Sequence, residues 1–369
     1  MKRLFCTAVI ALAMGLLFSD ALMAQKRAGK LKIFILAGQS NMEGKGSVET
    51  MDFQLQDPKK KSRFAHLKKG GSWVERDDVW IDYLGNNGQR HGKLTVGYGV
   101  SKQGDQRLFG PELGFGWTVG DALAEEVLII KTAWGGKSLD RDFRSPSRGF
   151  PDSLTEVVEK RQKKDPQLTV EKYKEGYGHF YRQMMGEVDK VLGDLKTYVP
   201  DYADQGYEIA GFVWFQGWND QYAPTSVEDY EDNMAGFIKD VRKTLGTPKL
   251  PFVIGAMGHH GDEQKGRIKQ IADAQAAVAE RPEFEGNVIT IRTARFWDME
   301  AQAAFDTHWA NKETRDIEKW KTFGNDRPYH YLGSPVFFYN TGVALGDAML
   351  RLNGIAVPGT SLSWPSSGK

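Results

Sequence analysis

Short apolar runs rich in β-branched residues recur along the chain, and most are separated by longer segments with helical spacing. Runs of this length and composition predict buried strands. They are KIFILAG (32–38), EVLIIKTA (126–133), YEIAGFVWFQG (207–217), LPFVIGAM (250–257) and NVITIRT (287–293). Continuous apolar strands that alternate with helices are typical of a parallel sheet covered on both faces. With right-handed crossovers they predict an α/β fold, a doubly wound three-layer α/β/α sandwich with a central parallel sheet.

Five segments have the pattern expected of helices. They cover residues 111–126, 178–198, 226–246, 263–280 and 334–354. The last has the clearest boundaries, because Ser334 suits an N-cap, Pro335 suits the first turn and Gly354 suits the end of the helix.

Two long segments do not follow this alternation. Residues 47–110 are polar and rich in glycine, and residues 137–177 carry KSLDRDFRSPSRGFPDS followed by a charged stretch. We expect both to be insertions in a single domain that spans residues 25–355, where they would lie as loops over the strand ends and shape a site. Residues 356–369 are expected to form a loose C-terminal tail.

The N-terminus has the pattern of a secretory signal peptide. Lys2 and Arg3 precede the apolar run LFCTAVIALAMGLLF, and small residues suit cleavage after Ala24. The run has about 15 residues, whereas a membrane-spanning helix needs roughly 20, which disfavours an uncleaved anchor. We therefore expect residues 1–24 to be removed and the mature protein to be exported, periplasmic or extracellular, without contact to the membrane.

Composition narrows the classes of function. A chain of 369 residues with 40% hydrophobic content is ample for one large domain. The formal net charge is +1, so no global charge points to nucleic acid as a partner. Cys6 is the only cysteine and lies in the signal peptide, so no disulfide or thiol chemistry is expected. No metal or cofactor is expected either, because the adjacent His259 and His260 are awkwardly placed to ligate one ion together.

The first strand ends in Gly-Gln-Ser-Asn, which places Ser40 where open α/β sheets bind their ligands. Gly38 allows a sharp turn, and a helix that begins near Asn41 would leave the Ser40 N–H without an acceptor. Such a serine can attack a carbonyl while its own N–H holds the oxyanion. A serine that merely caps a helix fits the stretch equally well. The spacing is not that of the G-x-S-x-G nucleophile elbow, because Met42 stands two residues after Ser40.

His330 is the candidate base for such a serine. It lies in NDRPYHYLGSP, just before the last predicted helix, and histidine titrates in the range that a general base needs. Asp326, four residues earlier, is placed to orient the imidazole, which gives the chain order Ser, Asp, His. Taken alone, His330 fits a structural or surface role as well.

Two further strands end in possible hydrogen-bond donors. GFVWF runs into Gln216 and Asn219, whose side-chain amides can hold an oxyanion. TAWGGKS follows the second predicted strand and offers the N–H of Gly135 or Gly136. Ordinary turns explain each feature alone. Four such features at one edge of the sheet favour a serine hydrolase site.

The chain resembles a known family over several of these motifs. FILAGQSNMEG resembles block I of the SGNH hydrolases, in the branch of sialate O-acetylesterases and carbohydrate esterase family 6. GPELGFG, KTAWGGKS and WFQGWND are similar to later blocks of that branch in the same order, and YHYLGS resembles its histidine block. The resemblance covers roughly residues 31–353. It implies a flavodoxin-like sandwich and serine hydrolysis of acetyl esters on sugars.

Residue by residue, the resemblance implies Ser40 as the nucleophile and His330 as the base. The oxyanion hole would consist of the N–H groups of Ser40 and Gly136 with the side chains of Asn219 and Gln216. Of the two glycines whose N–H could hold the oxyanion, Gly135 and Gly136, we favour Gly136.

Two positions depart from the family pattern. Trp218 stands where the sialate-esterase branch usually has Glu, and Asp326 and His330 are spaced D-x-x-x-H instead of D-x-x-H. A backbone carbonyl is the alternative partner of His330, which would leave a Ser-His dyad.

The sequence therefore predicts a secreted carbohydrate O-acetylesterase that acts on acetylated polysaccharides such as acetyl xylan, or on sialic-acid-type sugars. We expect Gln39, Trp218, Arg141 and Arg144 to contact substrate. The two arginines suit an acidic substituent on the sugar, and a structural salt bridge explains them equally well. Two alternatives remain open: an inactive glycan-binding protein on the same fold, and a lipase-like esterase of the superfamily, which would accept longer acyl chains.

Overall fold

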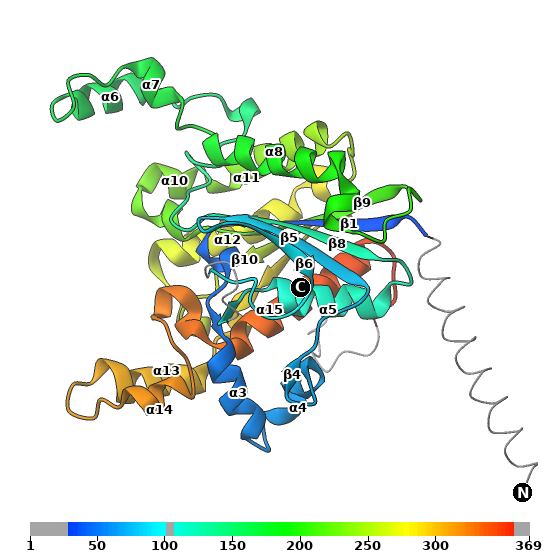
Figure 1. Ribbon diagram of the computed structural model, residues 1–369. Coiled ribbons are helices and arrows are strands. Elements are labelled where there is room, and N and C mark those ends of the chain that lie inside the picture. The colour runs from blue at the N-terminus through cyan, green and yellow to red at the C-terminus, as the bar shows by residue number, and fades with distance from the viewer. Residues whose placement is uncertain (1–28, 101–106, 358–369) are drawn as a thin grey trace, which may run out of the picture.

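A seven-stranded sheet runs through the protein (Figure 1). Its order is β11–β10–β9–β1–β8–β5–β6, and neighbouring strands are parallel except the edge pair β5 and β6. The strands are β1 (Leu31–Gly38), β5 (Val79–Gly85), β6 (Gly88–Lys93), β8 (Val127–Ala133), β9 (Tyr207–Phe215), β10 (Phe252–Ala256) and β11 (Val288–Arg292). The predicted central parallel sheet is thus confirmed.

The computed structural model describes residues 29–100 and 107–357. The expected signal peptide, residues 1–24, lies outside the described residues, as does the expected tail beyond residue 357. Within the described ranges, no helix combines the length and apolar character needed to cross a bilayer.

Helices cover both faces of the sheet, as predicted for a three-layer sandwich (Figure 1). One face carries α8 (His179–Gly193), α11 (Tyr230–Thr244) and α12 (Gly266–Glu280), and the other carries α5 (Glu112–Ala122) and α15 (Pro335–Leu352). Helix α15 begins as predicted, because the Ser334 hydroxyl accepts a hydrogen bond from the Phe337 N–H at 3.3 Å.

Strand β1 lies at the centre of the sheet and is buried on both faces. Ile33 and Ile35 belong to the core beneath α8, α11 and α12, whereas Phe34 and Leu36 belong to the core beneath α5 and α15. Each of these side chains is at most 2% exposed, and burial of one such side chain contributes about 1.5–3 kcal/mol. Because both faces of β1 are buried, its sequence is continuously apolar.

The expectation that residues 47–110 form only an inserted loop is wrong in one respect. This segment contains α3 (Val48–Gln56) and α4 (Lys61–Phe64), and it also supplies β5 and β6 of the main sheet. Strand β5 was missed because Asp82 interrupts its apolar pattern. The Asp82 carboxyl is fully buried, and its Oδ1 accepts a hydrogen bond from Gln89 of β6 at 2.8 Å. Its Oδ2 is buried without a hydrogen-bond partner, and burial raises the pKa of Asp82 to about 7.

Residues 137–177 carry a helical hairpin made of α6 (Leu154–Gln162) and α7 (Val170–Lys174). The hairpin extends from the upper left of Figure 1, while α13 (Met299–Phe305) and α14 (Ile317–Lys321) extend from the lower left. A small core of its own holds the α6–α7 hairpin together: Leu154, Val158, Tyr173 and Tyr177. The remaining short elements include α2 (Ser40–Glu43), α9 (Leu195–Tyr198), α10 (Pro224–Glu228) and the strand pairs β2 (Gly46–Ser47) with β7 (Leu108–Phe109) and β3 (Lys68–Lys69) with β4 (Ser72–Trp73).

The topology brings three strand ends together. Strand β1 lies between β8 and β9, so the chain crosses over β1 when it passes from β8 to β9. The last residue of β1, Gly38, is in register with Ala133 of β8 and with Phe215 of β9. Open α/β sheets bind ligands at such a crossing, outside the carboxyl ends of the strands.

Candidate active site

Ser40 is the first residue of α2, the single-turn helix that follows β1 directly. A side chain at Gly38 would clash with the Phe215 carbonyl of β9, so only glycine lets β1 turn into α2 here. Ser40 is 7% exposed, and its N–H lies in the first turn, where helix geometry provides no acceptor. The N–H is therefore available to an oxyanion.

His330 lies in the 3₁₀ segment Pro328–Gly333, and its Nδ1 is 3.0 Å from Asp326 Oδ2. The Arg327 N–H donates to the other Asp326 oxygen at 2.7 Å. The D-x-x-x-H spacing therefore still allows the carboxylate to orient the imidazole. Burial alone would raise the pKa of Asp326, but the hydrogen bond and charge of His330, the Arg327 N–H and the charge of Lys45 bring this pKa below its usual value.

The turn after His330 is held by its neighbour Tyr331. Tyr331 and Leu332 adopt φ of +52° and +62°, a left-handed conformation that costs about 1–2 kcal/mol per residue. Burial offsets this cost, because Tyr331 is 1% exposed and stacks on Phe337 with ring centroids 3.7 Å apart. The Gly258 N–H donates to the Tyr331 hydroxyl at 3.2 Å. The loop is thereby anchored to α15 and to the end of β10.

The structure brings the His330 loop close to α2. Tyr331, the neighbour of His330, packs against Phe215 of β9 with ring centroids 5.9 Å apart, and the Phe215 carbonyl accepts from the N–H of Gln39, directly before Ser40, at 3.4 Å. No hydrogen bond joins Ser40 to His330 within the described residues. In catalytic sites such contacts often tighten only in the complex with substrate.

Gln39 connects the turn between β1 and α2, which contains Ser40, to the loop after β9. Its Oε1 accepts from the N–H groups of Gly217 and Asn219, at 3.2 and 3.3 Å, and from Gln216 Nε2 at 3.1 Å. Its Nε2 donates to Asn219 Oδ1 at 3.3 Å. Because Gln39 is fully buried, the structure gives it a positioning role and does not present it to a substrate.

Asn219 and Gly136 border the site from the two neighbouring strands. Asn219 Nδ2 donates to the Gly136 carbonyl at 2.9 Å, which leaves its second hydrogen free. Gly136 is exposed, with φ of +75°. The N–H of Gly135 bonds to the Glu43 carboxyl, which also accepts from Asn86 Nδ2 at 3.0 Å. Gly136, the predicted donor, is thus the glycine whose N–H the Glu43 carboxyl does not occupy.

Gln216 does not face the site. It is fully buried, and its Nε2 donates to Asp220 Oδ2 at 2.6 Å and to the Lys137 carbonyl at 2.9 Å. Asp220 in turn accepts from the N–H groups of Leu139 and Asp140 at 3.0 Å each, and burial raises the pKa of Asp220 to about 7. These bonds join the loops after β8 and β9, so Gln216 supports the site and is not placed as an oxyanion donor.

Trp218 lies at the rim of the site together with two aromatic residues that sequence analysis did not select. Its ring centroid is 4.5 Å from that of His259 and 6.1 Å from that of Tyr329, and its Nε1 donates to the Tyr222 hydroxyl at 3.0 Å. Tyr222 is 67% exposed and Tyr329 is 36% exposed. Tyr329 directly precedes His330, and this position next to the candidate base could have identified Tyr329 as a site residue from the sequence.

The two arginines proposed for substrate have different surroundings. Arg144 is buried and pairs with Asp140 through Nη1 and Oδ1, 2.8 Å apart, and its Nε donates to the Gly149 carbonyl at 2.7 Å. It is therefore the structural salt bridge that was the alternative interpretation. Arg141 lines a pocket on the α6–α7 hairpin whose lining contains neither Ser40 nor His330.

A buried ion pair, which no local sequence pattern indicates, supports the end of α2. Lys131 of β8 and Glu112 of α5 are both fully buried, with Nζ and Oε2 2.6 Å apart. Lys131 Nζ also donates to the carbonyl of Glu43 at 2.9 Å. Burial lowers the pKa of Lys131 to about 8, against the opposing effect of Glu112. The GPELGFG motif thus acts on the site through Glu112.

No cluster of three or more His, Cys, Asp or Glu side chains suited to a metal is found in residues 29–100 and 107–357. His259 is fully buried, and its Nε2 lies 3.0 Å from the Tyr329 carbonyl. Burial lowers the pKa of His259 to about 3, so this histidine is neutral. Its ring stacks on Tyr331, the residue after His330, with ring centroids 4.1 Å apart.

The model of the family "Carbohydrate esterase, sialic acid-specific acetylesterase" matches residues 30–312, and the chain belongs to this family. The match includes Ser40, Gly136 and Asn219 and ends before Asp326 and His330. No curated protein matches the chain.

Solved structures with low sequence identity are similar to the chain. A protein from Arabidopsis thaliana has 18% identity and a TM-score of 0.48, over 87% of this chain and 98% of that one. A carbohydrate acetylesterase from Xanthomonas citri has 14% identity and a TM-score of 0.47, over 87% and 56%. The protein NanS has 12% identity and a TM-score of 0.46, over 88% and 98%.

Proposed function

We propose that this member of a carbohydrate esterase family is an exported serine hydrolase that removes O-acetyl groups from carbohydrates. The observation that carries the proposal is the pair of Asp326 and His330, 3.0 Å apart, held close to the helix that begins with Ser40. Gly136 and Asn219 supply donors from the two strands that flank β1. These are the parts that acyl transfer by a serine requires.

The proposed reaction begins when Ser40 Oγ attacks the acetyl carbonyl and its proton passes to His330 Nε2. Asp326 stabilises the imidazolium that results. The N–H groups of Ser40 and Gly136 and the free hydrogen of Asn219 Nδ2 hold the oxyanion. The tetrahedral intermediate collapses, and the sugar alkoxide leaves with the proton from His330. Water, deprotonated by His330, then releases acetate from acetyl-Ser40.

A sugar ring suits the rim of the site. The Tyr329 ring packs against His330 and Trp218 packs against Tyr329, with ring centroids 4.5 and 6.1 Å apart. Tyr222 accepts a hydrogen bond from Trp218, and Tyr222 and Tyr329 are substantially exposed. Aromatic rings combine a large apolar face with a polar edge, which suits the faces and hydroxyls of a sugar. The carbohydrate side of the ester would therefore lie on this rim while its acetyl group reaches Ser40.

The hydrogen bond between Asp326 and His330 weakens the case for an inactive glycan-binding protein, because that alternative rested partly on the unusual spacing of these two residues. The lipase-like alternative is decided by acyl-chain length. An acetylesterase should hydrolyse aryl acetate far faster than the corresponding aryl octanoate.

The test is acetate release by residues 25–369 from acetylated xylan oligosaccharides, from O-acetylated sialic acid and from an aryl acetate. Ser40→Ala is the inactive variant, and Ser145→Ala is the control, because Ser145 is a buried serine on another loop. Release that is lost only in Ser40→Ala supports the proposal. Release that persists in Ser40→Ala rejects Ser40 as the nucleophile. Export is tested separately by the N-terminal sequence of the protein recovered outside the cytoplasm.

A further inference from the structure

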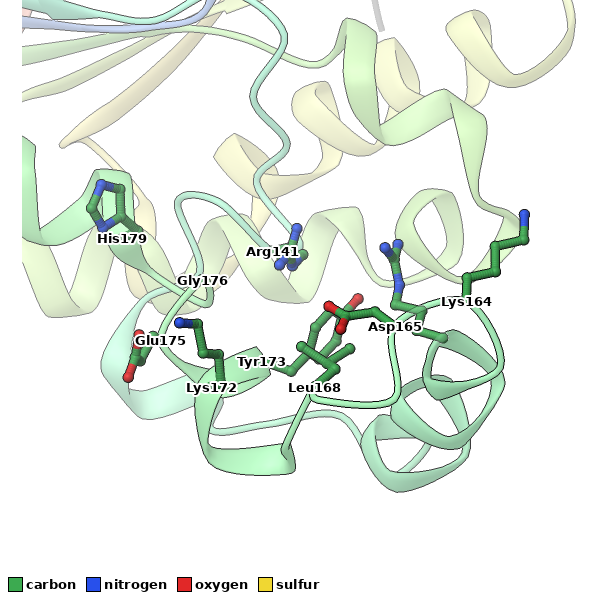
Figure 2. Close-up of a pocket in the computed structure, with 10 residues that line it drawn as sticks. Arg141, Lys164, Asp165, Leu168, Lys172, Tyr173, Glu175, Gly176 and His179 are labelled. Carbon is green, nitrogen blue, oxygen red and sulfur yellow. The ribbon is translucent and has the colours of Figure 1, made fainter.

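A pocket of about 510 Å³ lies between the α6–α7 hairpin and the loop that follows β8 (Figure 2). Its lining is predominantly cationic, with two carboxylates as the only acids among its residues. The charged lining residues, apart from His179, are Arg141, Arg161, Lys164, Lys172, Asp165 and Glu175. The pocket is distinct from the candidate active site, since its lining includes none of Ser40, His330 and Asn219.

The four cationic groups have no anionic partner. In the part of the chain that the structure describes, the side-chain nitrogens of Arg141, Arg161, Lys164 and Lys172 make no hydrogen bond and no ion pair. Arg141 Nε is buried without an acceptor. A guanidinium that is removed from water without an acceptor is costly, and an anion in the pocket would remove that cost.

Two of these cations share one aromatic ring. The guanidinium of Arg141 lies 4.7 Å from the centroid of Tyr173, and that of Arg161 lies 5.2 Å from it. Tyr173 is 7% exposed and belongs to the core of the hairpin, so the ring holds both guanidinium groups in place. Gly176 permits this packing, because a Cβ there would lie 2.6 Å from Arg141 Nη2. Two like charges held beside one cavity attract an anion between them.

The pocket is also coupled to the site by a short, well-fixed segment. Arg141 follows the candidate oxyanion donor Gly136 by five residues, which can span at most about 18 Å. Within that segment the Leu139 N–H donates to Asp220 at 3.0 Å, and the Arg141 N–H donates to the Ser138 hydroxyl at 3.2 Å. Arg141 therefore lies within about 18 Å of Gly136, so a substrate that occupies both places would be an oligosaccharide.

We infer that this pocket binds an anionic substituent, a carboxylate or a sulfate, on a sugar residue neighbouring the acetylated one. The inference rests on the proposed function and narrows its substrate to acidic acetylated oligosaccharides or polysaccharides. Guanidinium groups recognise both anions through paired hydrogen bonds, which selects them over neutral hydroxyls. The sugar that carries the charge is distinct from the sugar that loses its acetyl group.

The test compares three acetylated xylo-oligosaccharides of equal length: one neutral, one with a glucuronate branch and one with a sulfate in place of the uronate. The variant is Arg161→Gln with Lys172→Gln, both exposed residues whose replacement leaves the core intact. The control is Lys160→Gln with Lys163→Gln, which removes the same charge from α6 and its end, outside the pocket. An aryl acetate reports the chemistry alone.

We expect wild-type kcat/KM to be about tenfold higher for the charged substrates, a size within reach of two partly exposed ion pairs. The preference should arise in KM, vanish in the Arg161→Gln, Lys172→Gln variant, persist in the control and shrink at 0.5 M salt. Aryl acetate hydrolysis should not change. A preference for the uronate alone assigns the pocket to carboxylates, and an equal preference assigns it to either anion.

Equal rates on neutral and charged substrates, with aryl acetate still hydrolysed, would overturn the inference and leave the proposed function standing. If the aryl acetate is not hydrolysed, the proposed function fails. Calorimetric titration with the acetyl-free glucuronate oligosaccharide then tests separately whether the pocket binds an anion. Binding to wild type and to the Lys160→Gln, Lys163→Gln control, but not to the Arg161→Gln, Lys172→Gln variant, supports it. Absence of binding to wild type overturns it.

Discussion

Replacement of Asp326 tests how the base is held. Asp326→Ala removes the acceptor of the His330 Nδ1–H and lets the imidazole exchange tautomers. Asp326→Asn places either an oxygen or an N–H₂ group there, and the N–H₂ orientation favours the tautomer in which Nε2 carries the proton and cannot accept one from Ser40. The account therefore predicts that the nearly isosteric Asn is more harmful than Ala.

The size of the effect follows from the geometry. A hydrogen bond to a charged partner contributes about 1.5–3 kcal/mol. The side chains of His330 and Asp326 are 19% and 25% exposed, so solvent screening places this pair at the lower end of that range. About 1.5–2 kcal/mol corresponds to a 10- to 30-fold loss of kcat/KM for Asp326→Ala. Asp326→Asn adds the penalty of the wrong tautomer, which reaches about 10⁴-fold in Ser-His-Asp enzymes.

The assay is aryl acetate hydrolysis at pH 7.5, with thermal unfolding followed by circular dichroism to confirm that each variant is folded. Asp152→Asn, at an exposed loop position, is the matched control and should behave as wild type. Wild-type rates in both Asp326 variants would refute the triad and favour a Ser-His dyad. A folded Asp326→Ala that is slower than Asp326→Asn would refute the tautomer argument.

Three other predictions concern the oxyanion hole, pH and the buried ion pair. Asn219→Ala should lower kcat on an aryl acetate by about 10²–10³-fold, with KM little changed, because the lost donor acts in the transition state; an unchanged kcat would remove Asn219 from the oxyanion hole. Burial lowers the pKa of His259 from 6.5 to about 3, so the unfolded chain binds the proton first and stability is lost as pH falls below about 6.5. Between pH 7 and pH 5 the free energy of unfolding in urea should therefore fall by about 2 kcal/mol more in wild type than in His259→Gln, and equal losses would contradict this. Lys131→Met should lower the free energy of unfolding by about 3–5 kcal/mol, since it leaves Glu112 buried without its partner, and the double variant with Glu112→Leu should recover much of it; a double variant no more stable than Lys131→Met would show that the pair itself is not the cause.

The strands that could be predicted are those buried on both faces, because only they read as continuous apolar runs. Strand β5 could not be predicted in this way. Its buried Asp82 pairs with Gln89 of the adjacent strand β6, and no local pattern in the sequence contains that pairing. A buried aspartate that pairs with a neighbouring strand looks, in the sequence, like an exposed one.

The outline of the site could be predicted because parallel strands place their carboxyl ends at one edge, so Ser40, Gly136 and Asn219 had to lie near one another. The directions of individual side chains could not. Gln216 and Asn219 are three residues apart in one motif, yet Gln216 turns inward to Asp220 while Asn219 borders the site. The direction of each side chain depends on contacts between loops that are distant in the sequence.

The buried charged residues that support the site could not be predicted from the sequence either. Lys131, Glu112 and Glu43 come from three separate segments, and each looks like a solvated charge when its own segment is considered. Only the fold shows that the pair of Lys131 and Glu112 is fully buried and that Lys131 holds the end of α2. Burial of charge is a property of the tertiary structure, and sequence patterns report it poorly.

The most direct test of the account is to identify the residue that carries the acetyl group during turnover. The protein would be mixed with an aryl acetate, quenched in acid within the first turnovers, digested and analysed by mass spectrometry. The account predicts an acetyl group on Ser40, and neither acetyl-enzyme nor acetate release in Ser40→Ala. Acetate release by Ser40→Ala, or an acetyl group on another residue during turnover of wild type, would contradict the central claim.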